Sequence, residues 1–417
     1  MGGGKRGAII RIRLEPEFEE FRTGWRVVLA GLLGIALGMP GLPFYTIGIF
    51  APALAAEFGW SFASILAGLA LMTAAIVVAG PFAGVLIDRL GTRRVAPVSL
   101  VCLGISYMTL AASDGSLLLY YLSWAGIAAF GLGATPAAFT RAINGVFSAR
   151  RGLALGIALS GTGLLAFAVK PLVQLLVDAA GWRVGIIGVG ALPVLAAPAV
   201  HWAFAPRSAT TFAGRAERTS QPISDGFTAG EALRSRRFWL LAAVFMIMSL
   251  GTAAPFPNVE NVLRSLRISS EQIVQMSSLL GVAVLIGRIA GGLLTDRFWA
   301  PAIGAVILVM SATACFLLSW DDASPMQAFA AVALLGLAAG VEYDLMAYLV
   351  ARYLGMRNYA TVYAALYGIF SVGAGLGPSG FGYIFDRTGT YSQIFLACAL
   401  LLVTGAAVIL LLGPYPC

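Results

Sequence analysis

Twelve apolar runs follow one another along the chain, separated mostly by short polar gaps. Each run approaches or exceeds the length of about 20 residues that a helix needs to cross the hydrocarbon core of a bilayer. The pattern therefore predicts an all-α integral membrane protein with about twelve transmembrane helices. We place them at 27–50, 62–87, 95–113, 117–146, 152–177, 184–204, 238–260, 272–295, 301–320, 326–351, 359–384 and 392–413.

The composition agrees with a lipid environment. Of the 417 residues, 59% are hydrophobic and 11% are charged, whereas soluble globular domains carry about 25% charged residues. The net charge of +8 is also compatible with nucleic-acid binding, but the Lys and Arg residues lie in the gaps between apolar runs rather than along one face. We therefore expect the lipid bilayer, and no nucleic acid, as a partner.

The positive residues also orient the chain. The N-terminus, the even-numbered gaps and the central gap hold 20 of the 27 Lys and Arg residues, and the opposite gaps hold four. Positive residues favour the cytoplasmic side, and an even number of spans puts both termini on one side. We expect a multi-pass cell-membrane protein with both termini cytoplasmic, and the compact loops and short tail suggest a bacterial inner membrane.

Two motifs occur twice, each time 208 residues apart. G-x-L-x-D-R occupies 84–89 and 292–297, and D-x-x-G occupies 178–181 and 386–389. One offset shared by two independent motifs indicates two pseudo-symmetric six-helix bundles. The predicted parts are a cytoplasmic N-terminal segment (1–26), an N-terminal bundle (27–204), a cytoplasmic linker (205–237), a C-terminal bundle (238–413) and a short cytoplasmic tail (414–417). A short amphipathic helix is expected near 228–237.

The first motif has a physical interpretation of its own. Gly84 and Gly91 permit close helix packing and a tight turn. Asp88 stands at a helix end, where it can pair with an arginine or face the N-terminus of another helix. A loop that served only to orient the chain would explain the arginines that follow, but not the glycines or the acid.

The run 84–94, Gly-Val-Leu-Ile-Asp-Arg-Leu-Gly-Thr-Arg-Arg, resembles the signature of the major facilitator superfamily between its second and third helices. The degenerate copy at 292–297 lies where that family has one. The resemblance covers nearly the whole chain and implies two bundles that rock about a central site by alternating access. It implies a role in conformational gating for the residues of both copies: Gly84, Asp88, Arg89, Gly91, Arg93, Arg94, Gly292, Asp296 and Arg297.

Further motifs are similar to the monocarboxylate and oxalate–formate carriers of that superfamily. They are Arg-Arg-Gly-Leu-Ala-Leu-Gly at 150–156, Gly-Trp-Arg at 181–183 and Gly-Pro-Ser-Gly-Phe-Gly at 377–382. In this branch an arginine in helix eight holds the substrate carboxylate, and Arg288 stands at the matching position. Some members carry a lysine in helix one or helix eleven, but 27–50 has none and Val372 stands at the second position. These departures weaken the case for a dicarboxylate.

Five ionisable residues lie well inside the predicted spans: Arg141, Lys170, Arg288, Glu342 and Asp344. Each costs about 2.5–3.5 kcal/mol at the bilayer centre on insertion scales, so they must pair or line a water-accessible cavity. None has a charged counterpart 208 residues away. We therefore expect the duplicated motifs to move the halves and the unduplicated charges to bind the solute, with the three cations as substrate-binding residues. For Lys170, which lies nearer the outer end, an ammonium that snorkels to the interface is the alternative.

Glu342 and Asp344 are two residues apart, so a helix directs them to nearly opposite faces and only one can face the cavity squarely. They belong either to a structural ion pair or to a proton-binding site, because burial disfavours a charged carboxylate.

Glycine and proline interrupt span one at 38–45 and span seven at 255–258. Broken helices expose backbone polar groups, which a membrane protein tolerates only beside protein or water. Tyr45 and Asn258 are therefore candidates to line the solute path, and kinks that serve helix packing are the alternative.

Together these features predict a secondary active transporter that moves a small organic anion, expected to be a monocarboxylate, in symport with protons. Drug or other solute efflux by proton antiport on the same fold is the alternative. Span one carries no acid, and span five lacks the G-x-x-x-G-P-x-x-G-G run that such carriers often have. A non-transporting receptor on the same fold is a further alternative.

An enzyme is not expected. His201 is the only histidine, the four cysteines show no paired or metal-binding spacing, and no G-x-x-x-x-G-K-[ST] nucleotide loop is present. We expect no cofactor and no metal, and a protein that functions as a monomer.

Overall fold

The structure is a computed structural model that describes residues 16–205 and 226–416. Apart from one isolated β-bridge, the regular structure of these residues is helical. Twelve helical segments of the described part are long and apolar enough to cross a membrane, which confirms the predicted fold class and number of spans. Residues 1–15 of the predicted N-terminal segment, 206–225 of the predicted linker and the last residue of the tail lie outside the described residues.

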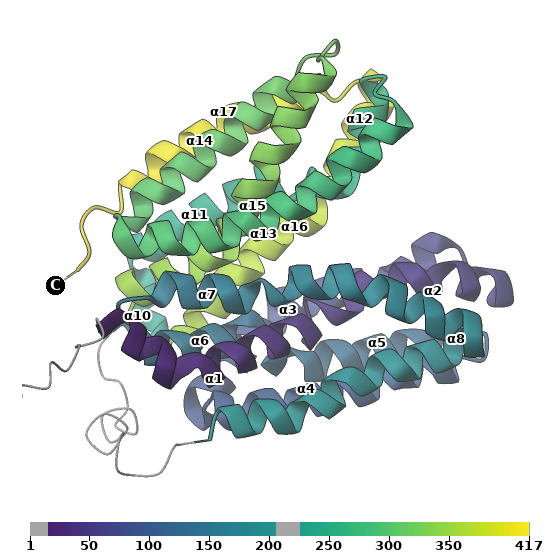
Figure 1. Cartoon of the computed structure of the whole chain (residues 1–417), viewed down its shortest axis with the longest axis horizontal. Coiled ribbons are helices and arrows are strands. Elements are labelled where there is room, and N and C mark those ends of the chain that lie inside the picture. The colour runs from purple at the N-terminus through teal and green to yellow at the C-terminus, as the bar shows by residue number, and fades with distance from the viewer. Residues whose placement is uncertain (1–15, 206–225, 417) are drawn as a thin grey trace, which may run out of the picture.

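The α-helices form two groups along the chain (Figure 1). The first group contains α1 (Pro16–Leu37), α2 (Leu42–Phe58), α3 (Phe62–Leu90), α4 (Thr92–Met108), α5 (Leu117–Gly131), α6 (Pro136–Val146), α7 (Arg151–Leu159) and α8 (Gly161–Ala203). The second contains α10 (Ala229–Arg234), α11 (Arg236–Met248), α12 (Val259–Ser265), α13 (Ser270–Arg297), α14 (Ala300–Leu318), α15 (Pro325–Tyr353), α16 (Tyr359–Thr388) and α17 (Ser392–Leu410).

Breaks in the first and fourth spans support each other. α1 and α2 are separated at 38–41, and a 3₁₀ turn (Leu132–Ala134) separates α5 from α6. The N–H of Met39 in the first break donates to the carbonyl of Ala134 in the second at 3.3 Å. One backbone N–H group of the first break and one carbonyl of the second thus satisfy each other, as polar backbone groups within a bilayer must. The glycines and prolines of span one predict the first break, whereas the second, ahead of Pro136, is not anticipated.

The seventh span is interrupted as predicted. α11 passes into a π turn (Ser249–Ala253) and a 3₁₀ turn (Phe256–Asn258) before α12 begins. The short helix expected before this span is present as α10, which Thr228 and Glu231 cap reciprocally. Hydrogen bonds from Thr228 to the Glu231 carboxylate hold the pKa of Glu231 below its usual range. α10 is shorter than expected because Ser235 caps a new helix, α11.

The duplicated D-x-x-G motif marks the same turn in both groups. Gly181 lies inside α8 with φ 83° and ψ 165°, so it divides that helix into spans five and six. Gly389, 208 residues later, ends α16 with φ 74°. Glycine adopts positive φ without the steric cost that a side chain would add.

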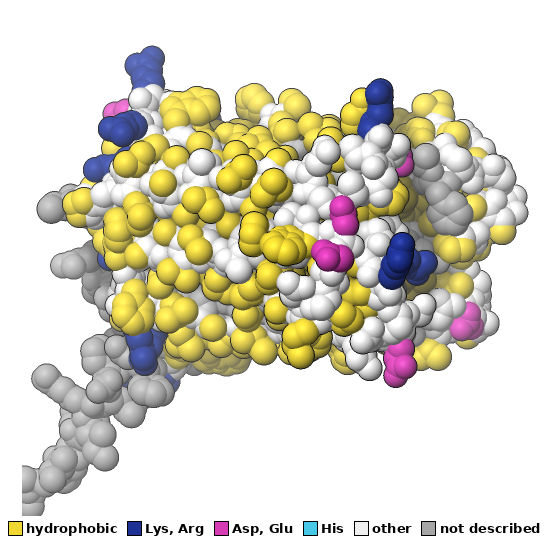
Figure 2. All heavy atoms as spheres, turned by 90° about the horizontal axis from the view of Figure 1, so that it is seen from above, with side chains coloured by type: hydrophobic (Ala, Val, Ile, Leu, Met, Phe, Trp, Pro, Cys, Tyr) yellow, Lys and Arg dark blue, Asp and Glu magenta, His cyan; other side chains and the backbone are white. Residues whose placement is uncertain are grey.

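The two groups pack side by side and diverge at one end. α3 lies against α16, and α7 lies against α13 and α15. In Figure 1 the groups separate toward α2 and α12 and approach each other near α6 and α10. Figure 2 views the second group from outside, and hydrophobic side chains cover most of that face. This surface suits contact with lipid.

Asp88 joins α3 to α16 of the other group. Its carboxylate accepts hydrogen bonds from the backbone N–H groups of Ala360 (3.1 Å) and Thr361 (3.0 Å) and from the Thr361 hydroxyl (2.8 Å). Arg141 of α6 donates its Nε–H to the same carboxylate at 2.9 Å. Asp88 therefore has both partners that its place in the sequence predicts, an arginine and a helix start, where free N–H groups and the helix dipole stabilise an anion.

Asp296 makes the corresponding contact from the second group to the first. It accepts hydrogen bonds from the N–H groups of Gly152 (2.6 Å) and Leu153 (2.9 Å) at the start of α7. The offset of 208 residues that relates Asp88 to Asp296 also relates these two donors to the two in α16. The contacts are thus pseudo-symmetric counterparts. We call the end of the molecule that contains them the motif end.

Glycines let the backbones approach closely enough for these hydrogen bonds. A Cβ atom on Gly84 would lie 2.5 Å from the Cα of Thr361, and a Cβ atom on Gly292 would lie 2.4 Å from the carbonyl oxygen of Gly152. No side chain fits at such distances without moving the helices apart. Gly91 turns the chain from α3 into α4 with φ 81°.

Neutralising both aspartates is expected to loosen the motif end. In an Asp88→Asn/Asp296→Asn protein each amide keeps an acceptor oxygen but loses its charge, and charge-assisted hydrogen bonds are about twice as strong as neutral ones. The buried Asn144 donates to the carbonyl of Ala347 in the other group at 3.3 Å. A cysteine at position 144 therefore becomes accessible when the two groups of helices separate at this end. In a background without the native cysteines, we expect Asn144→Cys to react with a thiol reagent about tenfold faster or more, which corresponds to about 1.4 kcal/mol.

The matched control is Asp386→Asn, which changes an exposed aspartate of α16 outside the two G-x-L-x-D-R copies. This variant should leave the labelling rate unchanged. If the double variant also reacted at the starting rate, the two aspartates would not hold the motif end closed.

Close packing of α13 on α15 is expected to contribute to stability. A Cβ atom on Gly287 would lie 2.1 Å from the carbonyl oxygen of Leu337, whereas one on Gly281 of the same helix would meet nothing within 4 Å. Gly287→Ala should lower the apparent unfolding temperature in detergent by about 3–6 °C. Gly281→Ala should leave it unchanged or raise it, because alanine favours helices over glycine by about 1 kcal/mol. Equal stability of the two variants would contradict this packing.

Candidate functional site

A cavity of about 330 Å³ lies between the two groups of helices. The first group lines it from α1, α2, α3, α6, α7 and α8, and the second lines it from the turns after α11 and from α13, α15 and α16. The interruptions of spans one and seven border it through Pro40 and Phe256. The duplicated scaffold therefore places its broken helices around one central space.

Arg288 of α13 is a charged residue of this cavity, with only 5% of its surface exposed. Its Nη1 lies 3.6 Å from Oδ1 of Asp344, which is close for an ion pair but too long for a hydrogen bond. Its guanidinium carbon lies 5.9 Å from the ring centre of Tyr343, within the range of a cation–π contact. Within the described part of the chain, Nε and Nη1 have no hydrogen-bond partner. A buried guanidinium with unsatisfied N–H groups is suited to binding an anion.

The two acids of α15 occupy different positions. Glu342 lines the cavity, whereas Asp344 lies beside Arg288 on the side of α7, where a Cβ atom on Gly156 would come within 3.4 Å of its Oδ2. Both acids are 2% exposed. Among the described residues, Oε1 of Glu342 and both carboxylate oxygens of Asp344 lack hydrogen-bond partners. Burial with these oxygens unsatisfied makes the charged form of each acid costly.

Tyr45 and Asn258 have different surroundings. Tyr45 of α2 lines the cavity and is 36% exposed. Asn258 donates its Nδ2–H to the carbonyl of Pro378 at 3.1 Å, which ties the turn before α12 to α16. The structure thus brings Tyr45 to Arg288 and Glu342 and gives Asn258 a packing contact instead.

Arg141 lies at the motif end and not at the central solute site that the sequence suggests. It belongs to α6 but pairs with Asp88 at the motif end, with 23% of its side chain exposed. The cause is the break ahead of Pro136, which starts a new helix whose arginine meets the end of α3. Lys170 lies in α8, and its side chain is outside what the structure describes.

Four of the proposed gating residues make the contacts between groups described above: Gly84, Asp88, Gly292 and Asp296. The arginines of the two motif copies, Arg89, Arg93, Arg94 and Arg297, are exposed at helix ends. Arg94 also borders an apolar groove of about 650 Å³ on the outer side of α3, α4 and α5. These arginines therefore lie at the surface of the motif end.

Apart from Tyr45, the aromatic residues of the cavity are absent from the sequence-based predictions. Tyr343 stands between the two acids of α15 and meets the ring of Tyr367 at 5.8 Å. Tyr367 is the last of three tyrosines of α16, spaced four residues apart, whose neighbouring rings stack at 5.8 and 6.2 Å. Phe44 and Phe256 complete this set of rings at the cavity. The spacing of four along the eleventh span is the signal that could identify one aromatic face.

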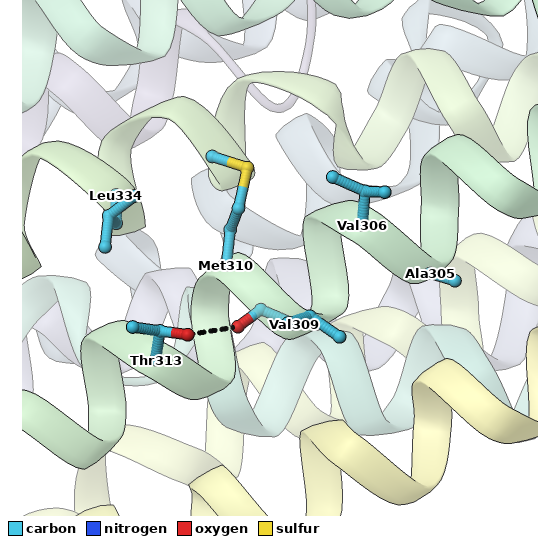
Figure 3. A pocket seen from close by; sticks show the side chains of 6 residues that line it. All are labelled: Ala305, Val306, Val309, Met310, Thr313 and Leu334. Atoms are coloured by element: carbon cyan, nitrogen blue, oxygen red, sulfur yellow. Dashed lines mark hydrogen bonds between the residues drawn. The ribbon is translucent and has the colours of Figure 1, made fainter.

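A second hollow is lined by no charged side chain among the described residues. It lies between α14 and α15 and is lined by Ala305, Val306, Val309, Met310, Thr313 and Leu334 (Figure 3). The Thr313 hydroxyl donates to the carbonyl of Val309 at 2.9 Å, so this polar group is satisfied within its own helix. Val306 and Val309 are largely exposed, as residues in contact with lipid would be. No group of three or more His, Cys, Asp or Glu residues able to hold a metal occurs in the described segments.

Comparisons with known proteins agree with this architecture. The family model of the Major Facilitator Superfamily matches residues 32–378. The chain is 26% identical over 400 residues to Monocarboxylate transporter 11 of Mus musculus, covering 92% of this chain and 86% of that protein. It is 24% identical over 359 residues to the uncharacterized MFS-type transporter YhjX of Escherichia coli (strain K12), covering 85% and 86%.

Solved structures share the fold. The proton:xylose symporter XylE superposes with a TM-score of 0.76 at 12% identity, covering 95% of this chain and 97% of that one. The E. coli fucose:proton symporter FucP superposes with a TM-score of 0.63 at 14% identity, covering 93% and 98%. At these identities the structures establish the fold alone. Because the family match spans most of the chain and agrees with its doubled motif and twelve helices, the protein belongs to the Major Facilitator Superfamily of transporters.

Proposed function

We propose that this protein is a secondary active transporter that carries a monocarboxylate together with protons by alternating access. The observation that carries the proposal is Arg288, a buried guanidinium in the cavity between the two groups whose Nε–H and Nη1–H lack partners among the described residues. A guanidinium binds a carboxylate through paired hydrogen bonds. The similarity to proteins named monocarboxylate transporters supports the same class of substrate.

The proposed orientation follows from the positive residues. The motif end, with its excess of Lys and Arg, faces the cytoplasm, and the cavity serves the opposite side of a bacterial inner membrane in the state described. The hydrogen bonds of Asp88 and Asp296 close the cytoplasmic side in this state. Alternating access then requires both helix starts to lose their aspartate partners. One chain contains both halves of the transport path, so the functional unit is a monomer.

Proton coupling follows from the charges around Arg288. With Glu342 and Asp344 both ionised, the described cluster carries one positive and two negative charges, and a net negative charge repels an anion where the dielectric constant is low. Protonation of the acids removes this repulsion and frees Arg288 from Asp344. Anion and protons therefore favour each other's binding, which is the thermodynamic condition for symport.

Efflux of an organic cation by proton antiport is the second candidate. Glu342 lies in a cavity that also contains aromatic rings, and this combination suits a cation. Arg288 in the same cavity opposes it, because a cation would meet an uncompensated positive charge. Parallel transport assays with carboxylates and with cationic drugs distinguish the two.

Arg288→Ala is expected to abolish uptake without unfolding the protein. Loss of a bidentate, charge-assisted contact of about 2.7 kcal/mol should lower carboxylate uptake into proteoliposomes about 100-fold. Arg387→Ala removes an exposed arginine of α16 and should transport normally. The Arg288→Ala/Asp344→Asn protein does not leave an ionised Asp344 without its arginine, so its unfolding temperature separates a binding defect from a folding defect. Unchanged transport by purified Arg288→Ala would reject the role of Arg288.

Asp344→Asn is expected to uncouple transport from protons. The amide is permanently neutral, so the binding of substrate to Arg288 no longer requires protonation at this position. Proteoliposomes with an alkaline interior should fail to accumulate the substrate, whereas exchange of labelled for unlabelled substrate at equal pH should persist. Asp322→Asn, an exposed aspartate between α14 and α15, should behave as the unmodified protein. If Asp344→Asn accumulated the substrate under a pH gradient as well as the control does, proton coupling would depend on a residue other than Asp344.

A further inference from the structure

The polarity of the cavity is divided between its two walls. Arg288 and Glu342, the charged side chains that line it among those described, both belong to the second group of helices. The wall from the first group includes the apolar side chains of Met72, Ile76 and Leu159. A molecule held between the walls therefore meets charge on one side and hydrocarbon on the other.

The two threonine hydroxyls of the apolar wall already donate hydrogen bonds. The Thr73 hydroxyl donates to the carbonyl of Leu69 at 3.0 Å, and the Thr162 hydroxyl donates to that of Leu159 at 3.1 Å. Tyr45 adds a ring that meets a neighbouring phenylalanine edge-to-face at 5.4 Å. Since the threonine protons bond to backbone carbonyls of their own spans, these two side chains offer no donor to the polar groups of a ligand.

The opposite wall adds aromatic surface next to the charges. Tyr343 follows Glu342 in α15, and its ring lies 5.8 Å from that of Tyr367 in an edge-to-face arrangement. The hydroxyl of Ser371 on this wall donates to the carbonyl of Tyr367 at 2.7 Å, so it too is satisfied within its helix. Ring edges and faces of this kind favour contact with an aromatic or branched apolar group.

We propose that the substrate is a monocarboxylate with an aromatic or branched aliphatic body, of the aryl-alkanoate type. Its carboxylate binds Arg288, and its apolar body packs against Met72, Ile76 and Tyr45 of the first group. This inference rests on the proposed function and narrows its substrate class. A hydroxyl or a second carboxylate on the body would lose its water without gaining a partner from Met72, Ile76 or the two threonines, and this loss disfavours such a substrate.

The size of the cavity agrees with such a ligand. Its volume of about 330 Å³ lies at the small end of ligand pockets, which span about 300–1,000 Å³. A single ring or a branched chain joined to a carboxylate is a compact ligand that suits this space. The division of polarity, rather than the volume, then sets the preference among compact acids.

The test is substrate competition in proteoliposomes that contain the purified protein. Uptake of labelled 3-phenylpropionate should be inhibited by 4-methylpentanoate at least about tenfold more effectively than by lactate, glycerate or succinate, because one misplaced polar group is worth a factor of this order or more. A preference for lactate over both apolar acids would overturn the inference and leave the proposed function intact. Failure to transport any of these acids would overturn both.

Variants of α3 separate selectivity from stability. Ile76 faces the cavity with 5% of its surface exposed, and Val78 of the same helix is 70% exposed on the outer face. Ile76→Thr should raise the KM for 3-phenylpropionate about tenfold more than the KM for lactate. Val78→Thr, a similar exchange of a methyl for a hydroxyl, should change neither KM. Equal effects of Ile76→Thr on both acids would indicate a structural role and contradict the inference.

Discussion

Within the hydrocarbon of a bilayer, each backbone N–H group, carbonyl and charge must find its partner inside the protein. In this protein the backbone groups that need such partners lie where helices start and where they break. The start of α7 donates to Asp296, the start of α16 donates to Asp88, and one broken span donates to another through Met39. Because lipid tails remove the hydrophobic drive for helices to associate, such directional contacts decide where the two groups of helices meet. A contact made of a few hydrogen bonds is also one that can be lost and remade as a unit.

The cavity is one place where the same constraint is not fully met. At Arg288, N–H groups lie buried without hydrogen-bond partners in the described part of the chain, and the nearest carboxylate, that of Asp344, stands at ion-pair distance. Satisfied polar groups belong to the scaffold, whereas buried unsatisfied ones require a functional explanation. The duplication in the sequence follows this division, since the aspartate contacts recur after 208 residues and the central charges do not. The scaffold is pseudo-symmetric, and the solute site that we propose is not.

The sequence predicts the number of spans, the break in span one and the partners of Asp88, because bilayer thickness, proline and the free N–H groups of helix starts act locally and strongly. It does not predict the place of Arg141, because the break before Pro136 changes which neighbour that arginine meets without changing the apolar pattern of the span. The aromatic lining is missed for another reason. Tyr343 and Tyr367 lie in predominantly apolar spans, where mean hydropathy does not distinguish a side chain that faces lipid from one that faces a cavity. The rotation of α15, which turns Glu342 rather than Asp344 to the cavity, is likewise a property of packing.

The place of Arg141 changes the charge balance on which the proposed mechanism depends. With this arginine paired to Asp88, the central cluster of the described residues has more acid than base. In the proposed mechanism an anion therefore binds together with protons. The cluster also adjoins the contact between the groups. A Cβ atom on Gly156 of α7 would lie 2.5 Å from the carbonyl oxygen of Arg288, and the same pair of helices, α7 and α13, carries the Asp296 contact two turns away, about 12 Å along α13. In the proposed cycle, a proton and an anion that separate Arg288 from Asp344 alter the packing of these two helices near the cavity. The change therefore arises on the same helix pair that carries the Asp296 contact at the motif end.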